Sequence, residues 1–184
     1  MKKLILAAFV FLPALVFADS STDKKILKEL GVETVDQLIQ PKKVADGIYT
    51  PYAVWFTQSD DSAPTCVLIN KDDFTNVLDI MSPSEGEFPN CHQTIDDPVI
   101  SKIGKDYYAT YVYVVEDTRS DFETRYQLIK LTKEKFFACK KDYEISKAIG
   151  KNVKSKKMKL DAAIEKTIKQ FGCAEVLKQD DDEK

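Results

Sequence analysis

Histidine is almost absent from this sequence of 184 residues, in which His92 is the only one. Any catalytic triad or dyad with a histidine base would have to use that side chain. Its neighbour Cys91 is a poor partner, because adjacent side chains of an extended segment point to opposite faces. The sequence therefore argues against cysteine and serine hydrolases that depend on histidine.

Glycine is also scarce, and none of the six glycines belongs to a GxSxG elbow, a GxGxxG fingerprint or a P-loop. This argues against a serine nucleophile on a strained turn and against nucleotide binding. No CxxC pair and no EF-hand spacing occurs, so the sequence indicates neither structural zinc nor an EF-hand. We expect no metal, no cofactor and no enzymatic activity.

An excess of positive charge is missing too. The chain carries 27 Lys and Arg against 30 Asp and Glu, a formal net charge of −3. Nucleic-acid-binding domains present a basic patch or stripe. We therefore expect no nucleic-acid partner.

Long hydrophobic runs are confined to the N-terminus. Lys2 and Lys3 precede an apolar stretch at residues 4–17, and Ala18 supplies a small residue for cleavage before Asp19. This is the pattern of a secretory signal peptide. The stretch is shorter than the roughly 20 residues of a transmembrane helix. We interpret the segment as a signal peptide, with an uncleaved anchor as the alternative.

The remaining chain is long enough for one domain with its own core. We expect this domain to span residues 19–177, and an acidic, disordered tail to follow at residues 178–184. The domain would be soluble and periplasmic or secreted, without stable insertion in a membrane.

The four cysteines of an exported chain indicate disulfide bonds. Three pairings are possible, and we expect Cys66–Cys91 and Cys139–Cys173. Cys91 ends a connection rich in Pro, Gly and Ser, whereas Cys139 ends a strand and Cys173 follows a helix. Each bond would contribute about 3 to 4 kcal/mol on the chain-entropy estimate.

The chain is organised around three successive strands, at residues 107–115, 122–131 and 135–139. Aromatic and β-branched residues dominate this stretch, which suits a pleated and largely buried surface. With the flanking helices it predicts the α+β class. We expect a mostly antiparallel sheet packed against a C-terminal helix, with two related β-meanders as an open alternative.

The other elements follow from capping residues and hydrophobic periodicity. We predict helices at residues 23–30, 34–39, 142–149 and 160–171, strands at 48–57 and 65–69, and a strand or helical turn at 74–80. Gly150 is expected to end the helix before it, and the lysines of residues 151–159 to lie in a solvated linker. Alternation slips after Leu128, which predicts a bulge or a bend near that residue.

A weak internal repeat joins two parts of the chain. Six residues recur 60 positions later, namely Asp46, Thr50, Val54, Asp61, Leu68 and Ile69 as Asp106, Thr110, Val114, Asp121, Leu128 and Ile129. Two related units would explain the matches. Two unrelated meanders built from similar strand-forming residues would explain them equally well.

Acidic pairs in loops keep carboxylate chemistry open. The pairs are Asp60-Asp61, Asp72-Asp73 and Asp96-Asp97. Two carboxylates at a suitable separation hold calcium or hydrolyse glycosides. The simpler explanation is that aspartates cap and solvate turns.

The function that we predict is non-catalytic binding of another protein, as by an inhibitor or immunity protein against a secreted or envelope-acting enzyme. The partner-binding residues would be Asp60, Asp61, Arg119 and Asp121, whose charges would face a basic cleft of the partner.

Two alternatives remain at this point. The first is a small-ligand or lipid carrier with an apolar cavity between sheet and helix, lined by Trp55, Tyr111 and Phe137. The second is a carboxylate-based hydrolase.

Overall fold

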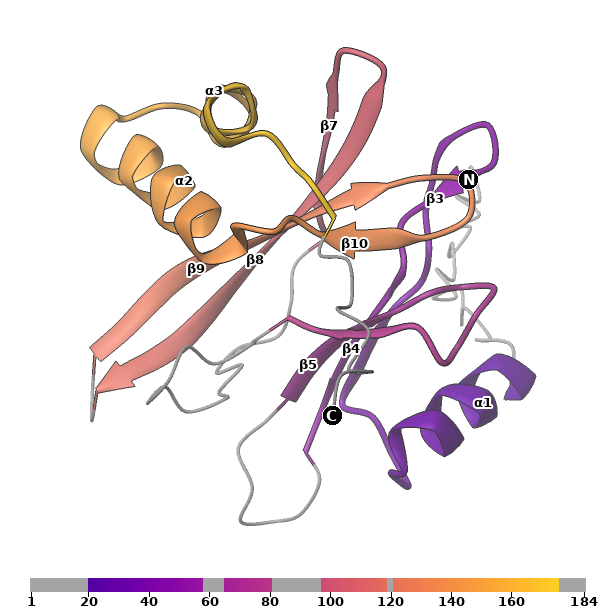
Figure 1. Cartoon of the computed structure of the whole chain (residues 1–184). Helices are drawn as coiled ribbons and strands as arrows, with labels where there is room; N and C mark the ends of the chain where they lie inside the picture. The colour runs from indigo at the N-terminus through magenta and orange to yellow at the C-terminus, as the bar shows by residue number, and fades with distance from the viewer. Residues whose placement is uncertain (1–19, 58–64, 81–96, 119–120, 176–184) are drawn as a thin grey trace, which may run out of the picture.

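The structure is a computed structural model that describes residues 20–57, 65–80, 97–118 and 121–175 (Figure 1). It belongs to the α+β class, as the sequence predicts, with antiparallel sheets and a C-terminal helix packed on one of them. In chain order the described elements are α1 (Ser20–Leu30), β1 (Gln37–Ile39), β2 (Lys43–Ala45), β3 (Ile48–Tyr49), β4 (Tyr52–Phe56), β5 (Thr65–Ile69), β6 (Val77–Asp79), β7 (Val99–Ile103), β8 (Asp106–Thr118), β9 (Asp121–Leu131), β10 (Phe136–Ala138), α2 (Asp142–Lys156) and α3 (Leu160–Phe171).

Two four-stranded sheets share one strand order. The first is β1-β4-β5-β6 and the second is β7-β8-β9-β10, with every neighbouring pair antiparallel. In each sheet three consecutive strands form a meander, and an earlier strand lies beside the first of them. The three strands expected at residues 107–139 are β8, β9 and β10. A two-stranded sheet pairs β2 with β3.

The elements stack in four layers: α1, the first sheet, the second sheet, and α2 with α3 (Figure 1). Alternation along a strand sends successive side chains to opposite faces. In the first sheet, Ala53 and Leu68 therefore face the second sheet, whereas Val54, Val67 and Ile69 pack on the side of α1.

The second sheet is covered on both faces as well. Tyr111 and Ile129 lie in the core between the sheets, and Tyr108, Tyr126 and Leu128 pack against α2 and α3. All five side chains are buried. A strand covered on both sides carries apolar residues at successive positions, and β8 and β9 do so for this reason.

The bulge predicted near Leu128 is therefore wrong. β8 and β9 pair in continuous register from Tyr107 opposite Leu131 to Glu116 opposite Phe122, and their irregularity lies between Glu116 and Thr118. The alternation slips in the sequence because the second face of β9 is buried against another sheet, not because the backbone bends.

One predicted helix, at residues 34–39, and one predicted helix boundary, at Gly150, are also wrong. Residues 37–39 form strand β1, paired with β4, where Leu38 packs in the cluster beside α1. Gly150 does not end α2, which continues to Lys156 and ends at Lys157 in the left-handed conformation. The turns of α2 after Gly150 are stabilised by two contacts. Val153 packs against the apolar cluster between the second sheet and the two helices α2 and α3, and buried Asn152 donates to Thr167 Oγ1 at 3.4 Å. Tertiary packing outweighs the low helix propensity of glycine.

The strand predicted at residues 48–57 is present in two pieces. β3 ends at Tyr49 and β4 begins at Tyr52, with Pro51 between them. Proline lacks an amide donor and is confined to edges and irregular points of a sheet. The strand at 65–69 and the short strand within 74–80 are confirmed as β5 and β6, whereas β2 and β7 were not predicted.

The internal repeat holds for topology and fails for individual residues. Leu68 faces the inter-sheet core, but its counterpart Leu128 faces the helices. Ile69 and Ile129 are reversed in the same way. The matched residues are out of step because the connections between the paired strands differ in length. The two meanders share an arrangement without sharing equivalent positions on their second strands.

The C-terminal helix α3 has the predicted bounds and ends at Gly172, whose φ of +68° suits glycine. A disulfide joins Cys139 to Cys173, with the Cα atoms 4.7 Å apart. This is the pair expected from the sequence, and it ties the end of α3 to the strand end after β10. Among the described residues, no helix has both the length and the apolar character needed to cross a bilayer.

Candidate functional site

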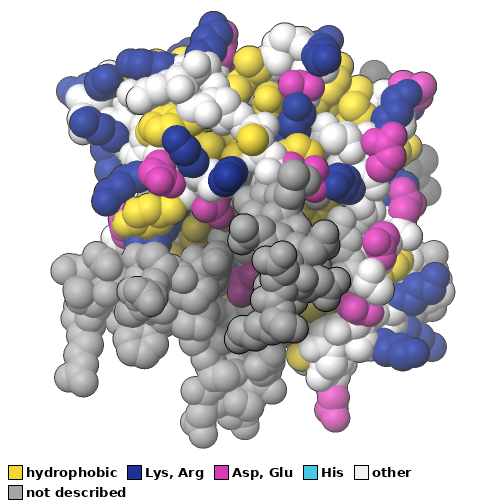
Figure 2. Space-filling view, viewed as in Figure 1, with side chains coloured by type: hydrophobic (Ala, Val, Ile, Leu, Met, Phe, Trp, Pro, Cys, Tyr) yellow, Lys and Arg dark blue, Asp and Glu magenta, His cyan; other side chains and the backbone are white. Residues whose placement is uncertain are grey.

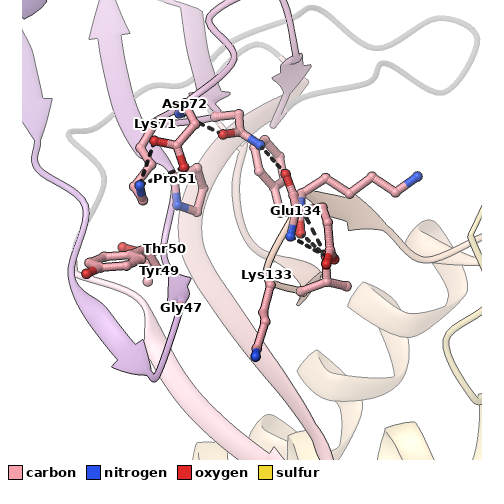
Figure 3. A pocket seen from close by; sticks show the side chains of 12 residues that line it. Gly47, Tyr49, Thr50, Pro51, Lys71, Asp72, Lys133 and Glu134 are labelled. Atoms are coloured by element: carbon pink, nitrogen blue, oxygen red, sulfur yellow. Dashed lines mark hydrogen bonds and ion pairs between the residues drawn. The ribbon is translucent and has the colours of Figure 1, made fainter.

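Two hollows in the described surface differ greatly in size. Figure 3 shows the small one, of about 20 Å³, between the turn after β5 and the turn after β9. Asn70 Nδ2 donates to the Glu134 carbonyl at 3.4 Å, Asn70 Oδ1 accepts from the Asp72 amide at 2.9 Å, and Lys71 pairs with Asp72 at 2.6 Å. The space suits about one water molecule. We interpret this hollow as a structural joint between the two sheets.

The larger hollow is a groove of about 440 Å³ between α2 and β9. We call it the α2–β9 groove. One wall consists of residues 123–125 of β9. The other wall is the face of α2 that carries Tyr143, Lys147, Lys151 and Lys154.

The lysines of this groove lie on one helix face. Lys147, Lys151 and Lys154 are four and three residues apart, which places them on one side of an α-helix. All three are exposed. Among the residues that the structure describes, no carboxylate forms an ion pair with them. Like charges at this spacing destabilise a helix by a few tenths of a kcal/mol per pair.

Dark-blue Lys and Arg side chains crowd the upper left of Figure 2, where α2 and α3 lie in Figure 1. The groove contributes four cations to this region, Arg125 and the three lysines, against one carboxylate, Glu123. The groove is therefore basic although the whole chain is acidic.

An aromatic ring marks one end of the groove. Tyr143 is 43% exposed. The guanidinium carbon of Arg125 lies 5.7 Å from its ring centroid, and Lys147 Nζ lies 5.2 Å from it. These cation–π contacts fix the ring between the two walls.

The groove floor is rigid because α2 is held close to β9. Ser146 Oγ accepts a hydrogen bond of 2.9 Å from the backbone amide of Tyr126. A Cβ atom at Gly150 would lie 3.5 Å from the Tyr126 ring, so helix and ring are nearly in contact. Arg125 is only 12% exposed and pairs with Glu123 at 3.3 Å.

Burial changes proton affinity near this floor. Desolvation raises the pKa of the Tyr126 phenol above its usual 10.0. It also raises the pKa of the Asp142 carboxyl at the start of α2 above 3.8, although the backbone amide of Tyr143 works in the opposite direction. Burial likewise raises the pKa of Tyr111 in the inter-sheet core.

The predicted partner-binding residues fall largely outside the described chain. Asp60, Asp61 and Arg119 lie outside the described residues, and so does the side chain of Asp121. The backbone of Asp121 opens β9 opposite Thr118. These four residues remain a sequence-based prediction.

The predicted Cys66–Cys91 disulfide and the single histidine, His92, involve residues that the structure does not describe. Cys66 is disulfide-bonded and completely buried. Its predicted partner Cys91 lies outside the described residues, as does His92.

The acidic pairs that are described have structural roles. Asp73 Oδ1 accepts hydrogen bonds from the amide and hydroxyl of Thr75, as in a capped turn. Asp72 pairs with Lys71, and Asp97 pairs with Lys42 at 2.6 Å. In the described part of the chain, no three acidic, histidine or cysteine side chains come together as a metal site.

The residues predicted to line a carrier cavity lie in different places. Tyr111 is 1% exposed in the inter-sheet core, and Trp55 packs against the same cluster. Both therefore lie between two sheets, not between a sheet and a helix. Phe137 follows Phe136, which belongs to that core, so it points to the other face of β10.

The groove lysines were missed because α2 was expected to stop at Gly150. With that boundary, Lys151 and Lys154 belong to a linker and have no fixed relation to Lys147. The 4-and-3 spacing from Lys147 onward was the available signal. No protein-family model, curated protein or solved structure matches this chain.

Proposed function

We propose that this protein is an exported, non-catalytic domain that binds another protein, as an inhibitor or immunity protein does. The α2–β9 groove carries this proposal. It brings three exposed lysines, none of which forms an ion pair with a carboxylate of the described chain, together with an exposed tyrosine on one wall, in a chain that is otherwise acidic.

The composition of the groove suits protein recognition. Tyrosine and arginine are enriched among the residues that dominate binding energy at interfaces, and Tyr143 stacks with Arg125 here. Lys147, Lys151 and Lys154 remain exposed side by side at a small cost in helix stability. A partner with negative charge would offset that cost and would be steered to the groove.

Two observations support export. The sequence begins with the pattern of a signal peptide. The Cys139–Cys173 disulfide belongs to oxidising compartments such as the periplasm or the extracellular space.

The test is affinity capture from the exported protein fraction of the source organism. The bait would be the wild-type domain, the groove variant K147E/K151E/K154E, or the control K105E/K133E/K140E, which changes charge equally at exposed lysines outside the groove. We expect the wild type and the control to retain the same partner and the groove variant to lose it. The hydrolytic activities of that fraction, measured with and without the domain, test inhibition directly.

The predicted acidic residues give a second arm of the same test. The variant D60K/D61K should lose the partner if those aspartates bind it. If D60K/D61K loses the partner and K147E/K151E/K154E retains it, the partner binds at the two aspartates and not at the groove. Turnover by the purified domain itself would contradict the non-catalytic assignment.

A further inference from the structure

A second group of lysines lies outside the α2–β9 groove, where the end of α2 meets α3. We call it the α2–α3 lysine cluster, and its members are Lys156, Lys157, Lys159 and Lys166. None of the four lines the groove. The amino groups of Lys156 and Lys166 lie within hydrogen-bonding reach of each other, so the cluster is continuous from α2 to α3.

The positive charge of this cluster is not balanced by its neighbours. All four side chains are exposed, and they belong to the region where dark-blue side chains crowd Figure 2. Within the described ranges of the chain, no Asp or Glu forms an ion pair with any of them. The hydrogen-bonding contact with Lys166, and then its positive charge, lower the pKa of Lys156 below the usual 10.5. Like charges therefore repel one another at this end of α2.

Helix stability does not account for the lysines of the cluster. A helix N-terminus carries a partial positive charge and favours acidic residues. Lys159 nevertheless occupies the N-cap of α3, where no side chain caps the helix. Lys157 ends α2 at a φ of +50°, where glycine is the usual residue, although its charge suits that end of the helix dipole. An anionic partner would offset the cost of this arrangement.

The composition of the cluster suits a lipid surface better than a protein surface. Protein interfaces are enriched in arginine and aromatic residues and depleted in lysine. The cluster contains no arginine and no aromatic ring, and the large exposed apolar side chains of the described chain lie elsewhere. Anionic headgroups of a fluid bilayer rearrange around flexible ammonium groups, and clusters of about four to eight basic residues are typical of binding to such a surface.

We infer that the α2–α3 lysine cluster docks the protein on an anionic lipid bilayer, through contacts between its ammonium groups and the headgroup phosphates. Docking is peripheral, because Met158, the apolar residue inside the cluster, packs inward against the helices. Each lysine near an anionic leaflet raises partitioning by about fivefold, so four lysines raise it by several hundredfold. This inference goes beyond the proposed function, since it adds a second surface and does not depend on the partner of the groove.

The test is co-sedimentation with vesicles, using the chain from Asp19 onward. This chain keeps every described residue and lacks the apolar residues 4–17, which would bind lipid by themselves. Phosphatidylcholine vesicles with about one third phosphatidylglycerol supply the anionic surface, and pure phosphatidylcholine is the control. We expect binding to the anionic vesicles only at about 0.1 M salt, and release at about 0.5 M salt because salt screens the charges.

Variants locate the binding surface. K156E/K157E/K159E/K166E should lower partitioning by about a hundredfold or more. K24E/K28E/K43E/K133E changes the charge equally at four exposed lysines of other elements and should lower partitioning by less than about tenfold.

Two further variants separate charge from folding. K156R/K157R/K159R/K166R keeps the charge and should bind as the wild type does. K156Q/K159Q/K166Q only neutralises charge, so it is expected to fold even if the charge-reversal variant does not, and it should lower partitioning by about tenfold or more. Circular dichroism measures the folding of each variant.

Contrary results are distinct from one another. Equal binding to both kinds of vesicle, or binding to neither, would refute docking on an anionic bilayer. Equal losses in the two charge-reversal variants would mean that net charge acts and not the cluster. Binding of soluble polyphosphate without binding to vesicles, or loss of a captured protein partner by K156E/K157E/K159E/K166E when vesicles are ignored, would replace the lipid with another partner. The proposed function fails separately, if partner capture does not depend on the groove lysines.

Discussion

At the scale of single residues, Ser146 has the most specific role, because its hydroxyl accepts the outward amide of Tyr126 and holds α2 against β9. The Tyr126 amide would otherwise be left without a partner beneath the helix. Ser146 itself is buried. One hydroxyl therefore contributes both to the stability of the α2–β9 contact and to the position of the groove wall.

We predict that S146A lowers the free energy of unfolding by about 1 to 3 kcal/mol, the cost of a buried donor left unsatisfied. Urea denaturation measures the change. The matched control is S155A, which removes an exposed hydroxyl from the same helix and should change stability by less than about 0.5 kcal/mol. Equal effects of the two variants would contradict the role of Ser146.

Gly150 offers a prediction of opposite sign. It lies inside α2, and an added Cβ would meet the Tyr126 ring at 3.5 Å, an ordinary van der Waals distance. G150A should therefore stabilise the protein by about 0.5 to 1 kcal/mol, the gain in helix propensity. Thermal unfolding should show a higher midpoint. A lower midpoint would mean that α2 and β9 are closer than this geometry indicates.

Asp142 gives stability a dependence on pH. Desolvation raises the pKa of its carboxyl in the folded protein above 3.8. Its contribution to stability is therefore complete below the unfolded pKa and is lost as pH rises through the folded pKa. D142N, which cannot ionise, should gain stability relative to the wild type between pH 3 and pH 7. Denaturation of both proteins at the two pH values measures the difference, and a relative loss would be the contrary result.

At the scale of elements, patterns over long apolar stretches predicted the structure well. The strands of residues 107–139 and the helix at 160–171 lie where aromatic, β-branched and periodic residues indicated. The errors arose where tertiary contacts override local signals. β1 forms because β4 offers a paired edge, and α2 passes Gly150 because Asn152 and Val153 find partners beyond it.

The disulfide acts on one element, because it ties the end of α3 to the strand end at Cys139. The bond spans 34 positions of the sequence. We predict that C139S/C173S lowers the free energy of unfolding by about 3 to 4 kcal/mol on the chain-entropy estimate. Guanidinium denaturation under non-reducing conditions measures this. A loss below about 1 kcal/mol would mean that α3 docks firmly without the bond.

At the scale of the whole molecule, the four layers explain which residues are apolar. Both sheets are covered on both faces, so adjacent positions of β4, β5, β8 and β9 are buried. In a single sequence, burial of both faces of a strand is visible only as a break in the alternation of apolar and polar residues. A bulge in the strand breaks the alternation in the same way. The stacking of two sheets and the groove beside α2 depend on contacts between distant segments, which strand and helix patterns do not encode.

The packing of α1 on the first sheet can be tested by substitution. Ile26 of α1 is 1% exposed against the first sheet, whereas Ile100 on the edge strand β7 is 42% exposed. I26A should cost about 2 to 5 kcal/mol, as for a buried isoleucine. I100A should cost less than about 1 kcal/mol. Comparable losses for both, measured by urea denaturation, would mean that α1 is not a packed layer.

The order of synthesis separates the two stacked sheets in time. A chain leaves the ribosome from its N-terminus, so the first sheet emerges well before the second. Ala53 and Leu68 lack their cover until Tyr111 and Ile129 arrive. The nascent first half must therefore keep an uncovered apolar face until the long hairpin of β8 and β9 closes over it, and the cysteine bond of α3 can lock the product only after that.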